Sequence, residues 1–269
     1  MSFRKRLPTS LIMLAAVFVS IQYLPDLGFF IAIQALILAA LLEFYNLASR
    51  REHSPQRILG FVLALIIAFS FFMEALPLGL ALFVCLLVTG VYFVLEINKL
   101  EKLKVFPPSI ALTVFGAVYL SFMLNHIYYL RREEGPFLIY FLLAVIFIGD
   151  TGAYVVGNLM GRHKMAPLAS PKKTWEGSFA GVITACLGGI AAQQILLPDV
   201  ALWKAALFAL LIHVVAQVSD PLESLFKRGA GVKDSSHILP GHGGFLDRVD
   251  SLILAVPFFY YLLEYVGMS

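Results

Sequence analysis

Charged side chains gather in one stretch of this sequence, residues 220–251, DPLESLFKRGAGVKDSSHILPGHGGFLDRVDS. The whole chain is 60% hydrophobic and only 14% charged, so such a concentration is unusual within it. The acids are Asp220, Glu223, Asp234, Asp247 and Asp250, and the bases are Lys227, Arg228, Lys233 and Arg248. Carboxylates bind hard divalent cations, and bases beside them neutralise phosphate oxygens. The stretch therefore predicts a site for a polyanion held through a metal. A solvated loop with incidental charge pairing would not explain its His-Gly-Gly turn.

A second polar run, Ser170-Pro171-Lys172-Lys173-Thr174-Trp175-Glu176-Gly177, lies where an apolar helix is predicted to begin. Backbone N–H groups, the helix dipole and two lysines together favour a bound phosphate group there. Paired lysines at the inner edge of a membrane are also what the positive-inside rule produces without any ligand. Without residues 220–251, this second explanation would be the better one.

An acidic residue, Asp150, interrupts the apolar run FLLAVIFIGDTGAYVVGNLMG. A carboxylate that faces lipid at this depth costs about 2.5–3.5 kcal/mol, so Asp150 must face protein or a watery cavity. Asp150, Tyr154, Gly157 and Gly161 follow one another at helical spacing, and the glycines would let another helix or a ligand approach. Intramembrane acids are functional by default, which favours a site over a purely structural lock between helices.

Apolar runs separated by short polar loops dominate the chain, whose mean hydropathy is +0.86. Runs of about 17–25 residues match the roughly 30 Å apolar thickness of a bilayer. The sequence predicts an all-α polytopic membrane protein with nine spans, near 9–24, 27–47, 57–73, 76–96, 107–124, 136–158, 175–197, 202–219 and 251–267. We expect residues 1–135 to form a scaffold of five spans. Residues 136–269 are expected to form the catalytic region, with polar loops 159–174 and 220–250.

The distribution of lysine and arginine sets the expected orientation. With the N-terminus in the cytoplasm, 17 of the 20 basic residues fall in inner segments, and both polar loops face the cytoplasm. The start, MSFRKRLPTSLIMLAAVFVS, is expected to be a retained signal anchor because it lacks a clear small-x-small cleavage site. The net charge of +3 is too small to suggest nucleic acid. Cys85 and Cys186 lack the neighbours of a zinc site and are interpreted as buried small side chains.

Other polar residues occur near the inner ends of spans. His213, Gln217 and Asp220 share one helical face, and Asp220 is the favoured metal ligand among them. His213 is interpreted as a hydrogen-bonded interior histidine. Glu43, near the end of the second span, is either a buried contact between helices or a distant wall of the site, and the structural interpretation is favoured.

These motifs resemble a known enzyme family. From Ser224 to Asp250 the chain reads S-x-F-K-R-x4-K-D-x-S-x2-L-P-x-H-G-G-F-x-D-R-V-D, which resembles the full signature of phosphatidate cytidylyltransferases, or CDP-diacylglycerol synthases. The motifs D-x2-A-Y, beginning at Asp150, and S-P-K-K-T-x-E-G, beginning at Ser170, are also similar to that family. The N-terminal half agrees with it only in hydropathy.

The resemblance implies an enzyme that joins CTP to phosphatidate, giving CDP-diacylglycerol and pyrophosphate. Our mechanistic hypothesis is attack of a lipid phosphate oxygen on the CTP α-phosphorus. The resemblance also implies a dimeric, magnesium-dependent, all-helical membrane enzyme; a second cation is left open. Together with the distribution of basic residues, this predicts a multi-pass protein of the cell membrane whose site faces the cytoplasm and which contacts membrane lipids. We expect metal binding by Asp220 and Asp247, with Asp250 or Asp150 contributing. Phosphate-binding bases are expected to be Lys172, Lys173, Lys227, Arg228, Lys233 and Arg248, with His242 positioning groups. The remaining expected substrate-binding residues are Ser170, Thr174, Glu176, Ser224, Asp234, Gly243 and Gly244.

Two other functions stay open. A related CTP-dependent enzyme would act on another lipid phosphate or on a polyprenol. An ion-coupled transporter would use Asp150, His213 and Glu43 as an ion path, but the charge lies on one side of the membrane and no internal repeat is detectable.

Overall fold

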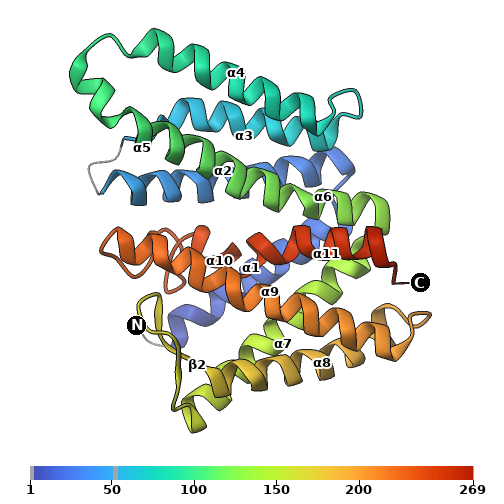
Figure 1. The fold of residues 1–269 in the computed structure, drawn as a ribbon. Helices are drawn as coiled ribbons and strands as arrows, with labels where there is room; N and C mark the ends of the chain where they lie inside the picture. Colours follow the sequence, from blue (N-terminus) through green and yellow to red (C-terminus); the bar gives the residue numbers. More distant parts are fainter. Residues whose placement is uncertain (1–2, 51–53, 269) are drawn as a thin grey trace. The chain divides into compact units, whose positions relative to one another are not determined.

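The computed structural model describes residues 3–50 and 54–268, which form helices joined by short connections and one small sheet (Figure 1). The helices are α1 (Phe3–Tyr23), α2 (Asp26–Ser49), α3 (Arg57–Phe72), α4 (Leu78–Glu96), α5 (Leu100–Ala117), η1 (Val118–Phe122), α6 (Met123–Glu134), α7 (Pro136–Met160), α8 (Trp175–Leu196), α9 (Leu202–Gly229), α10 (Leu246–Val249) and α11 (Leu252–Val266). The strands β1 (Lys164–Ala166) and β2 (Ser170–Thr174) pair in antiparallel orientation as a hairpin between α7 and α8.

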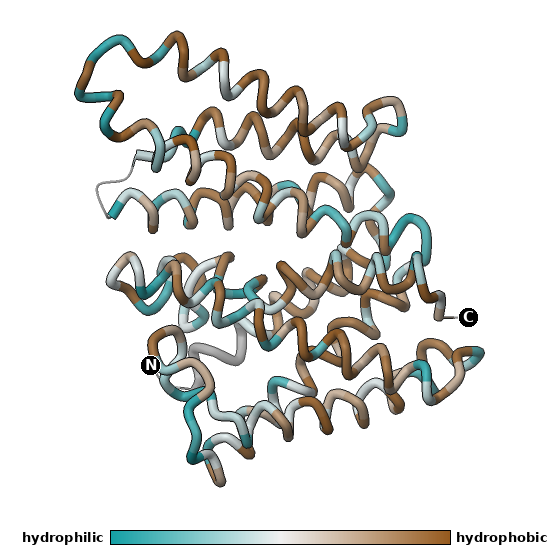
Figure 2. The backbone as a smooth tube through the Cα atoms, viewed as in Figure 1, coloured by the Kyte–Doolittle hydropathy of each residue, from teal (hydrophilic) through white to brown (hydrophobic). Residues whose placement is uncertain are grey.

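Seven helices in the described part of the chain are long and apolar enough to cross a membrane, judged by length and composition. They correspond to seven of the nine predicted spans, and the other two spans fall on the shorter apolar helices Thr9–Tyr23 and Arg57–Phe72. Figure 2 shows hydrophobic residues along the helices and hydrophilic residues mainly at their ends. The predicted all-α polytopic membrane fold is confirmed. The count of nine spans and the cytoplasmic N-terminus stay predictions, and Arg51, one of the charges behind that orientation, lies outside the described residues.

Large apolar side chains cover the outer faces of several helices. Val94 and Leu159 are each 79% exposed, and Ile195 is 81% exposed. Large apolar side chains are seldom this exposed in such number on soluble monomers. In a bilayer the lipid chains cover them, which agrees with the membrane-spanning lengths of the helices.

The chain divides into two compact units. One comprises Met1–Tyr128 and Gly229–Val249, and the other comprises Tyr129–Arg228 and Asp250–Ser269. The first boundary lies near the expected division at residue 135. Residues 229–249, which we call the signature loop, group instead with the N-terminal helices because α10 packs against α2.

In the first unit, α2 is the central helix and packs against α1, α3, α5, η1 and α10. The hydroxyl of Tyr45, which is fully buried, donates a hydrogen bond to the Thr113 carbonyl oxygen at 2.7 Å. A side chain at Gly60 or Gly116 would collide with the Tyr45 ring, so these glycines let α3 and α5 approach α2. The C-terminal part of α2, which carries Glu43, is thereby fixed in the core of this unit.

In the second unit, α7 and α8 form an antiparallel pair joined by the β hairpin. Their backbones approach closely, because a Cβ atom added to Gly177 would lie only 3.0 Å from Gly157 Cα. This approach agrees with the expectation that the glycines of the Asp150 face admit another helix. The helix α11 also packs in this unit, because the Phe259 ring of α11 contacts the rings of Phe141 on α7 and Phe208 on α9.

The two predicted polar loops contain more regular structure than expected. The first includes the β hairpin, and in the second α9 continues through Pro221, so that the irregular segment begins after Gly229. A proline inside a helix removes one backbone hydrogen bond and tends to kink the helix. In the turns that follow, Lys227 Nζ lies 2.5 Å from Glu223 Oε2, a pair that supports the helical conformation.

Candidate active site

A polar pocket of about 300 Å³ lies in the second unit, where α7, the β hairpin, α8 and α9 meet. Its polar lining residues are Asp150, Tyr154, Asn158, Ser170, Lys172, Lys173, Thr174, Ser178, Gln217 and Asp220. The pocket therefore brings together three motifs that are separate in the sequence: the acid within a span, the lysine run, and the last turns of the predicted eighth span.

Two charged residues of opposite sign face each other in this pocket. Lys173 Nζ lies 2.7 Å from Asp220 Oδ2, and their side chains remain 27% and 31% exposed. The hydroxyl of Ser224 donates a weaker hydrogen bond to Asp220 Oδ1 at 3.3 Å. Asp150 is exposed in the same pocket. Carboxylate oxygens and ammonium groups are thus both available to a ligand that carries phosphate and a cation.

Thr174 and Glu176, two of the expected substrate-binding residues, hold the hairpin to α8. Thr174 is the N-cap of α8, and its Oγ1 accepts a hydrogen bond from the Gly177 N–H at 3.2 Å. The Glu176 carboxylate accepts hydrogen bonds from the backbone N–H groups of Arg162 and His163 and lies 2.5 Å from His163 Nδ1. In this structure both side chains make hydrogen bonds to protein groups and so fix the conformation of the site.

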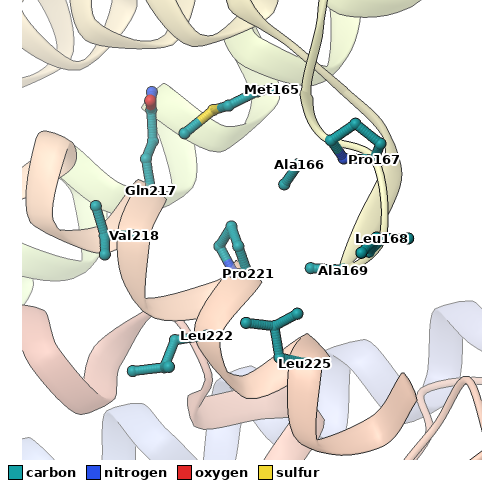
Figure 3. Close-up of a pocket in the computed structure, with 10 residues that line it drawn as sticks. All are labelled: Met165, Ala166, Pro167, Leu168, Ala169, Gln217, Val218, Pro221, Leu222 and Leu225. Atoms are coloured by element: carbon teal, nitrogen blue, oxygen red, sulfur yellow. The ribbon is translucent and has the colours of Figure 1, made fainter. Parts of the chain in front are cut away.

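An apolar groove of about 410 Å³ lies beside the polar pocket (Figure 3). Hairpin residues 166–169 form one wall, and the other is formed by Val218, Pro221, Leu222 and Leu225 of α9. Met165 and Gln217 line both the groove and the pocket. Ser178 fixes the Gln217 amide, because its hydroxyl donates to Gln217 Oε1 and its carbonyl oxygen accepts from Gln217 Nε2 at 3.0 Å. Gln217 thus marks the change from polar to apolar lining.

Lys227 and Arg228, two bases expected at phosphates, have protein partners. Lys227 is paired with Glu223, and the two side chains are only 7% and 1% exposed. Arg228 Nε donates to the Ala169 carbonyl oxygen at 3.2 Å, which ties the end of α9 to the hairpin. Among the bases of this unit, Lys172 and Lys173 line the polar pocket instead.

In the first unit, the signature loop folds around the carboxylate of Asp247. Its Oδ2 accepts hydrogen bonds from the Ser235 N–H at 2.9 Å and the Gly244 N–H at 2.8 Å, and it shares the single proton of the Ser235 hydroxyl, 2.8 Å away, with Glu43 Oε2. Gly243 has a φ of +79°, a conformation that favours glycine, and a Cβ atom there would lie 2.6 Å from Asp247 Oδ2. The glycines of the His-Gly-Gly turn therefore allow the loop backbone to approach the Asp247 carboxylate closely.

Glu43 of α2 also contacts this loop, although it is absent from the expected site. Its Oε1 accepts hydrogen bonds from the Ser236 hydroxyl and the Phe245 N–H, and its Oε2 accepts them from the Ser235 hydroxyl and the Leu246 N–H. The favoured interpretation of Glu43 was a contact between helices, whereas the contacts observed here are with the signature loop. The sequence feature that could have indicated a functional contact for Glu43 was its position as an acid near the end of an apolar span.

The other signature residues are either exposed or engaged at the edges of the loop. Lys233, Asp234 and Arg248 are exposed. His242 Nε2 lies 2.9 Å from Ser10 Oγ, and its Nδ1 lies 3.2 Å from the Pro240 carbonyl oxygen. These contacts are consistent with a positioning role for His242.

Asp250 and His213 belong to the second unit. The Asp250 carbonyl oxygen accepts a hydrogen bond from the Ser219 hydroxyl, and its Oδ1 accepts one from the Ser251 N–H at 2.7 Å. Asp250 therefore stabilises the connection into α11. His213 is interior, as predicted, but within residues 3–50 and 54–268 neither ring nitrogen has a hydrogen-bond partner, so the expected hydrogen bond is not observed.

Within the described parts of the chain, histidine, cysteine, aspartate and glutamate residues do not form a group of three or more that could hold a metal ion. Asp150 and Asp220 line one pocket, whereas Asp247 belongs to the other unit. A metal site built from Asp150, Asp220, Asp247 and Asp250 stays a prediction.

Comparison with known proteins identifies the family. A sequence profile described as the cytidylyltransferase family matches residues 4–266, which is nearly the whole chain. The chain belongs to the cytidylyltransferase family.

Several cytidylyltransferases with curated names are similar to this chain. The phosphatidate cytidylyltransferase of Brucella suis is 31% identical over 252 residues, which are 93% of this chain and 89% of the relative. That of Staphylococcus epidermidis is 37% identical over 172 residues, 64% of this chain and 66% of the relative. That of Staphylococcus saprophyticus is 41% identical over 155 residues, 58% of this chain and 56% of the relative. The chain thus spans slightly less than two thirds of the first Staphylococcus relative and little more than half of the second.

Membership of the cytidylyltransferase family confirms the predicted family and enzyme class. It also favours an enzyme over an ion-coupled transporter. In the transporter hypothesis Glu43 would line an ion path, but in the structure this side chain is buried and accepts hydrogen bonds from the signature loop.

Proposed function

We propose that this cytidylyltransferase transfers the cytidylyl group of CTP to phosphatidate, giving CDP-diacylglycerol and pyrophosphate. One observation carries the proposal: a polar pocket with two lysines and two carboxylates adjoins an apolar groove. Both lie in the unit whose helices α7, α8 and α9 are long enough to span a membrane. The names of the Brucella and Staphylococcus relatives support the same reaction.

An amphiphilic phosphate matches the two linings. A phosphate group in the polar pocket would lie beside Lys172 and Lys173, which attract its negative oxygens. A lipid chain leaving the pocket past Gln217 would enter the groove between the hairpin and α9. A free nucleotide would use only the first of these surfaces.

The reaction exchanges one phosphorus–oxygen bond for another. An oxygen of the phosphatidate phosphate attacks the α-phosphorus of CTP, and the bond from this phosphorus to the oxygen that bridges to the β-phosphate breaks. Its electron pair leaves with pyrophosphate. A phosphate monoester has a second pKa of about 6, so the nucleophile is already ionised at neutral pH and needs no strong general base. The lysines would orient the two substrates and reduce the repulsion between them.

We propose magnesium as the cofactor. Asp150 and Asp220 fit such an ion because hard cations prefer carboxylate oxygens, and both residues line the pocket that holds Lys172 and Lys173. Bound magnesium would supply positive charge for the phosphate oxygens and the leaving group. Contributions from Asp247 and Asp250 stay predictions. Removing divalent cations with a chelator should abolish turnover, and Asp150→Asn should raise the magnesium concentration required for half-maximal rate.

We also propose that the polar pocket faces the cytoplasm and that the enzyme is a homodimer of the cell membrane. The lysine and arginine distribution supports the orientation. The resemblance of the motifs supports the dimer. Labelling of Lys172→Cys in a Cys85→Ala, Cys186→Ala background, with a membrane-impermeant reagent in inside-out and right-side-out vesicles, tests the orientation. Light scattering of the purified protein in detergent tests the dimer.

Pyrophosphate release tests the reaction directly. Purified protein in phosphatidate-containing micelles is supplied with CTP and magnesium, and CDP-diacylglycerol is detected by mass spectrometry. Release that requires both substrates and the metal supports the proposal. A folded protein that releases pyrophosphate only with an isoprenoid phosphate would assign another lipid phosphate as the substrate.

A further inference from the structure

We propose that Glu43 is a positioning residue that holds the signature loop in its active conformation. The inference deepens the proposed function, because it assigns to an N-terminal helix a part in cytidylyl transfer. Glu43 itself would act through the loop that it binds.

The first observation is that Glu43 joins two separate segments of the loop. In the first segment it accepts hydrogen bonds from the hydroxyls of Ser235, at 2.8 Å, and Ser236, at 2.7 Å. In the second segment it accepts them from the backbone N–H groups of Phe245, at 3.1 Å, and Leu246, at 2.9 Å. Both oxygens of one carboxylate therefore clamp segments that lie about ten residues apart in sequence.

The second observation is burial. Glu43 is only 2% exposed, and it lies on α2, the central helix of its unit. A buried carboxylate is stable only when hydrogen bonds replace its lost hydration, and hydrogen bonds to an ionised acceptor are about twice as strong as neutral ones. The loop donors meet this requirement, so the position of the loop and the burial of Glu43 depend on each other.

The third observation links Glu43 to Asp247, which the signature places among the functional acids. The Ser235 hydroxyl lies 2.8 Å from Glu43 Oε2 and 2.8 Å from Asp247 Oδ2. Gly244 donates its N–H to Asp247, while a side chain at this position would collide with Glu43 Oε2. Movement of Glu43 would therefore change the hydrogen bonds that orient Asp247.

The primary test is Glu43→Gln, which keeps the side-chain size but replaces one acceptor oxygen with an NH₂ group. We expect kcat to fall about 10- to 100-fold, as for small displacements of catalytic groups, with little change in KM for CTP. In an Asp247→Asn background the same substitution should produce almost no further loss, because its effect passes through Asp247. If the reduction of kcat in the double variant equals the product of the reductions in the two single variants, the inference is overturned.

A matched control is Gln34→Leu, also on α2. Gln34 is buried and its Nε2 donates to Asn125 Oδ1 at 2.6 Å, remote from the signature in sequence. This variant removes a buried hydrogen bond from the same helix and should keep kcat near the wild-type value. Equal losses of kcat in Gln34→Leu and Glu43→Gln would mean that α2 has only a general structural role.

Hydrogen exchange supplies a readout that does not depend on turnover. In Glu43→Gln, the amides of Phe245 and Leu246 should exchange about tenfold faster, while those in the centre of α2 keep their protection. Unchanged exchange at both amides would overturn the inference. If the wild-type protein fails to use phosphatidate, the proposed function fails, but faster exchange would still show that Glu43 holds the loop. Ser236→Ala removes one donor to Glu43 without altering the acid and should give the same exchange pattern at smaller amplitude.

Discussion

The ammonium group of Lys173 lies 2.7 Å from Asp220 Oδ2, so a base expected to bind phosphate and an acid expected to bind metal neutralise each other in the polar pocket. Each partner lowers the electrostatic cost of placing the other in a partly dry site. A substrate phosphate would compete for Lys173, and a cation would compete for Asp220. The ion pair is therefore the contact in this pocket that we expect substrate binding to rearrange.

Substitution of Asp220 tests the acidic half of this pair. Asp220→Asn preserves the side-chain shape but removes its charge, and we expect turnover at saturating magnesium to fall about 10²–10³-fold, as when one charge-stabilising group is lost from an active site. Pyrophosphate release measures the effect. Asp199→Asn is the matched control, because Asp199 is exposed in the connection between α8 and α9 and should tolerate the change. Near-normal turnover by Asp220→Asn would contradict this role.

Substitution of Lys173 tests the basic half. Lys173→Met keeps the apolar stem but removes the ammonium group, and we expect KM for at least one substrate to rise about tenfold, which matches the loss of one hydrogen bond to a charged group. Initial rates at varied CTP and phosphatidate show which substrate is affected. Combination with Asp220→Asn should be non-additive, because the two residues are in contact. Fully additive losses would mean that the pair does not act as a unit.

Filling the apolar groove tests where the lipid binds. Leu225→Trp places a larger side chain in the groove wall, and we expect KM for long-chain phosphatidate to rise about tenfold, within the range of misfit in an apolar pocket. KM for CTP should not change. Leu210→Trp, on an exposed position of the same helix outside the groove lining, is the control. Equal effects of the two substitutions would place the acyl chain elsewhere.

The glycine at position 244 provides a test of loop packing. A side chain there would collide with Glu43 Oε2 and Ser235 Oγ, so Gly244→Ala should destabilise the protein by about 1–3 kcal/mol, as overpacking does elsewhere. A lower midpoint of thermal unfolding in detergent measures this effect. Gly229→Ala is the control, because a Cβ atom at Gly229 would meet open space. An unchanged midpoint for Gly244→Ala would show that the loop adjusts freely.

Most of the fold could be predicted because a bilayer imposes one dominant constraint. A span must be helical and apolar over a fixed length, and hydropathy alone reveals such segments. The short hairpin could not be predicted in this way. Its strand Ser170–Thr174 carries a proline and two lysines, which indicate a loop by composition, and its pairing depends on the close approach of α7 and α8.

The candidate site was predictable in its residue types but not in its partners. The signature indicated Asp247, Gly243 and Gly244, yet the acid that fills the space beside Gly244 is Glu43, about two hundred residues earlier in the chain. No local pattern connects such distant positions. Similarly, Lys227 was expected to bind a phosphate group, but its ammonium group forms a buried ion pair with Glu223, one helical turn away.

The cap of α8 shows how the lysines of the polar pocket are located. Thr174 follows Lys172 and Lys173 directly and is 4% exposed, and a Cβ atom added to Gly157, Gly161 or Gly177 would press against its hydroxyl oxygen. Two backbone segments, the end of α7 and the first turn of α8, therefore enclose the residue at the end of the hairpin. The glycines leave no side chains of their own between Thr174 and these two helices, so main-chain packing fixes where the backbone that carries Lys172 and Lys173 ends. Substrates would then be accommodated by movement of the two lysine side chains, and not by rearrangement of the hairpin.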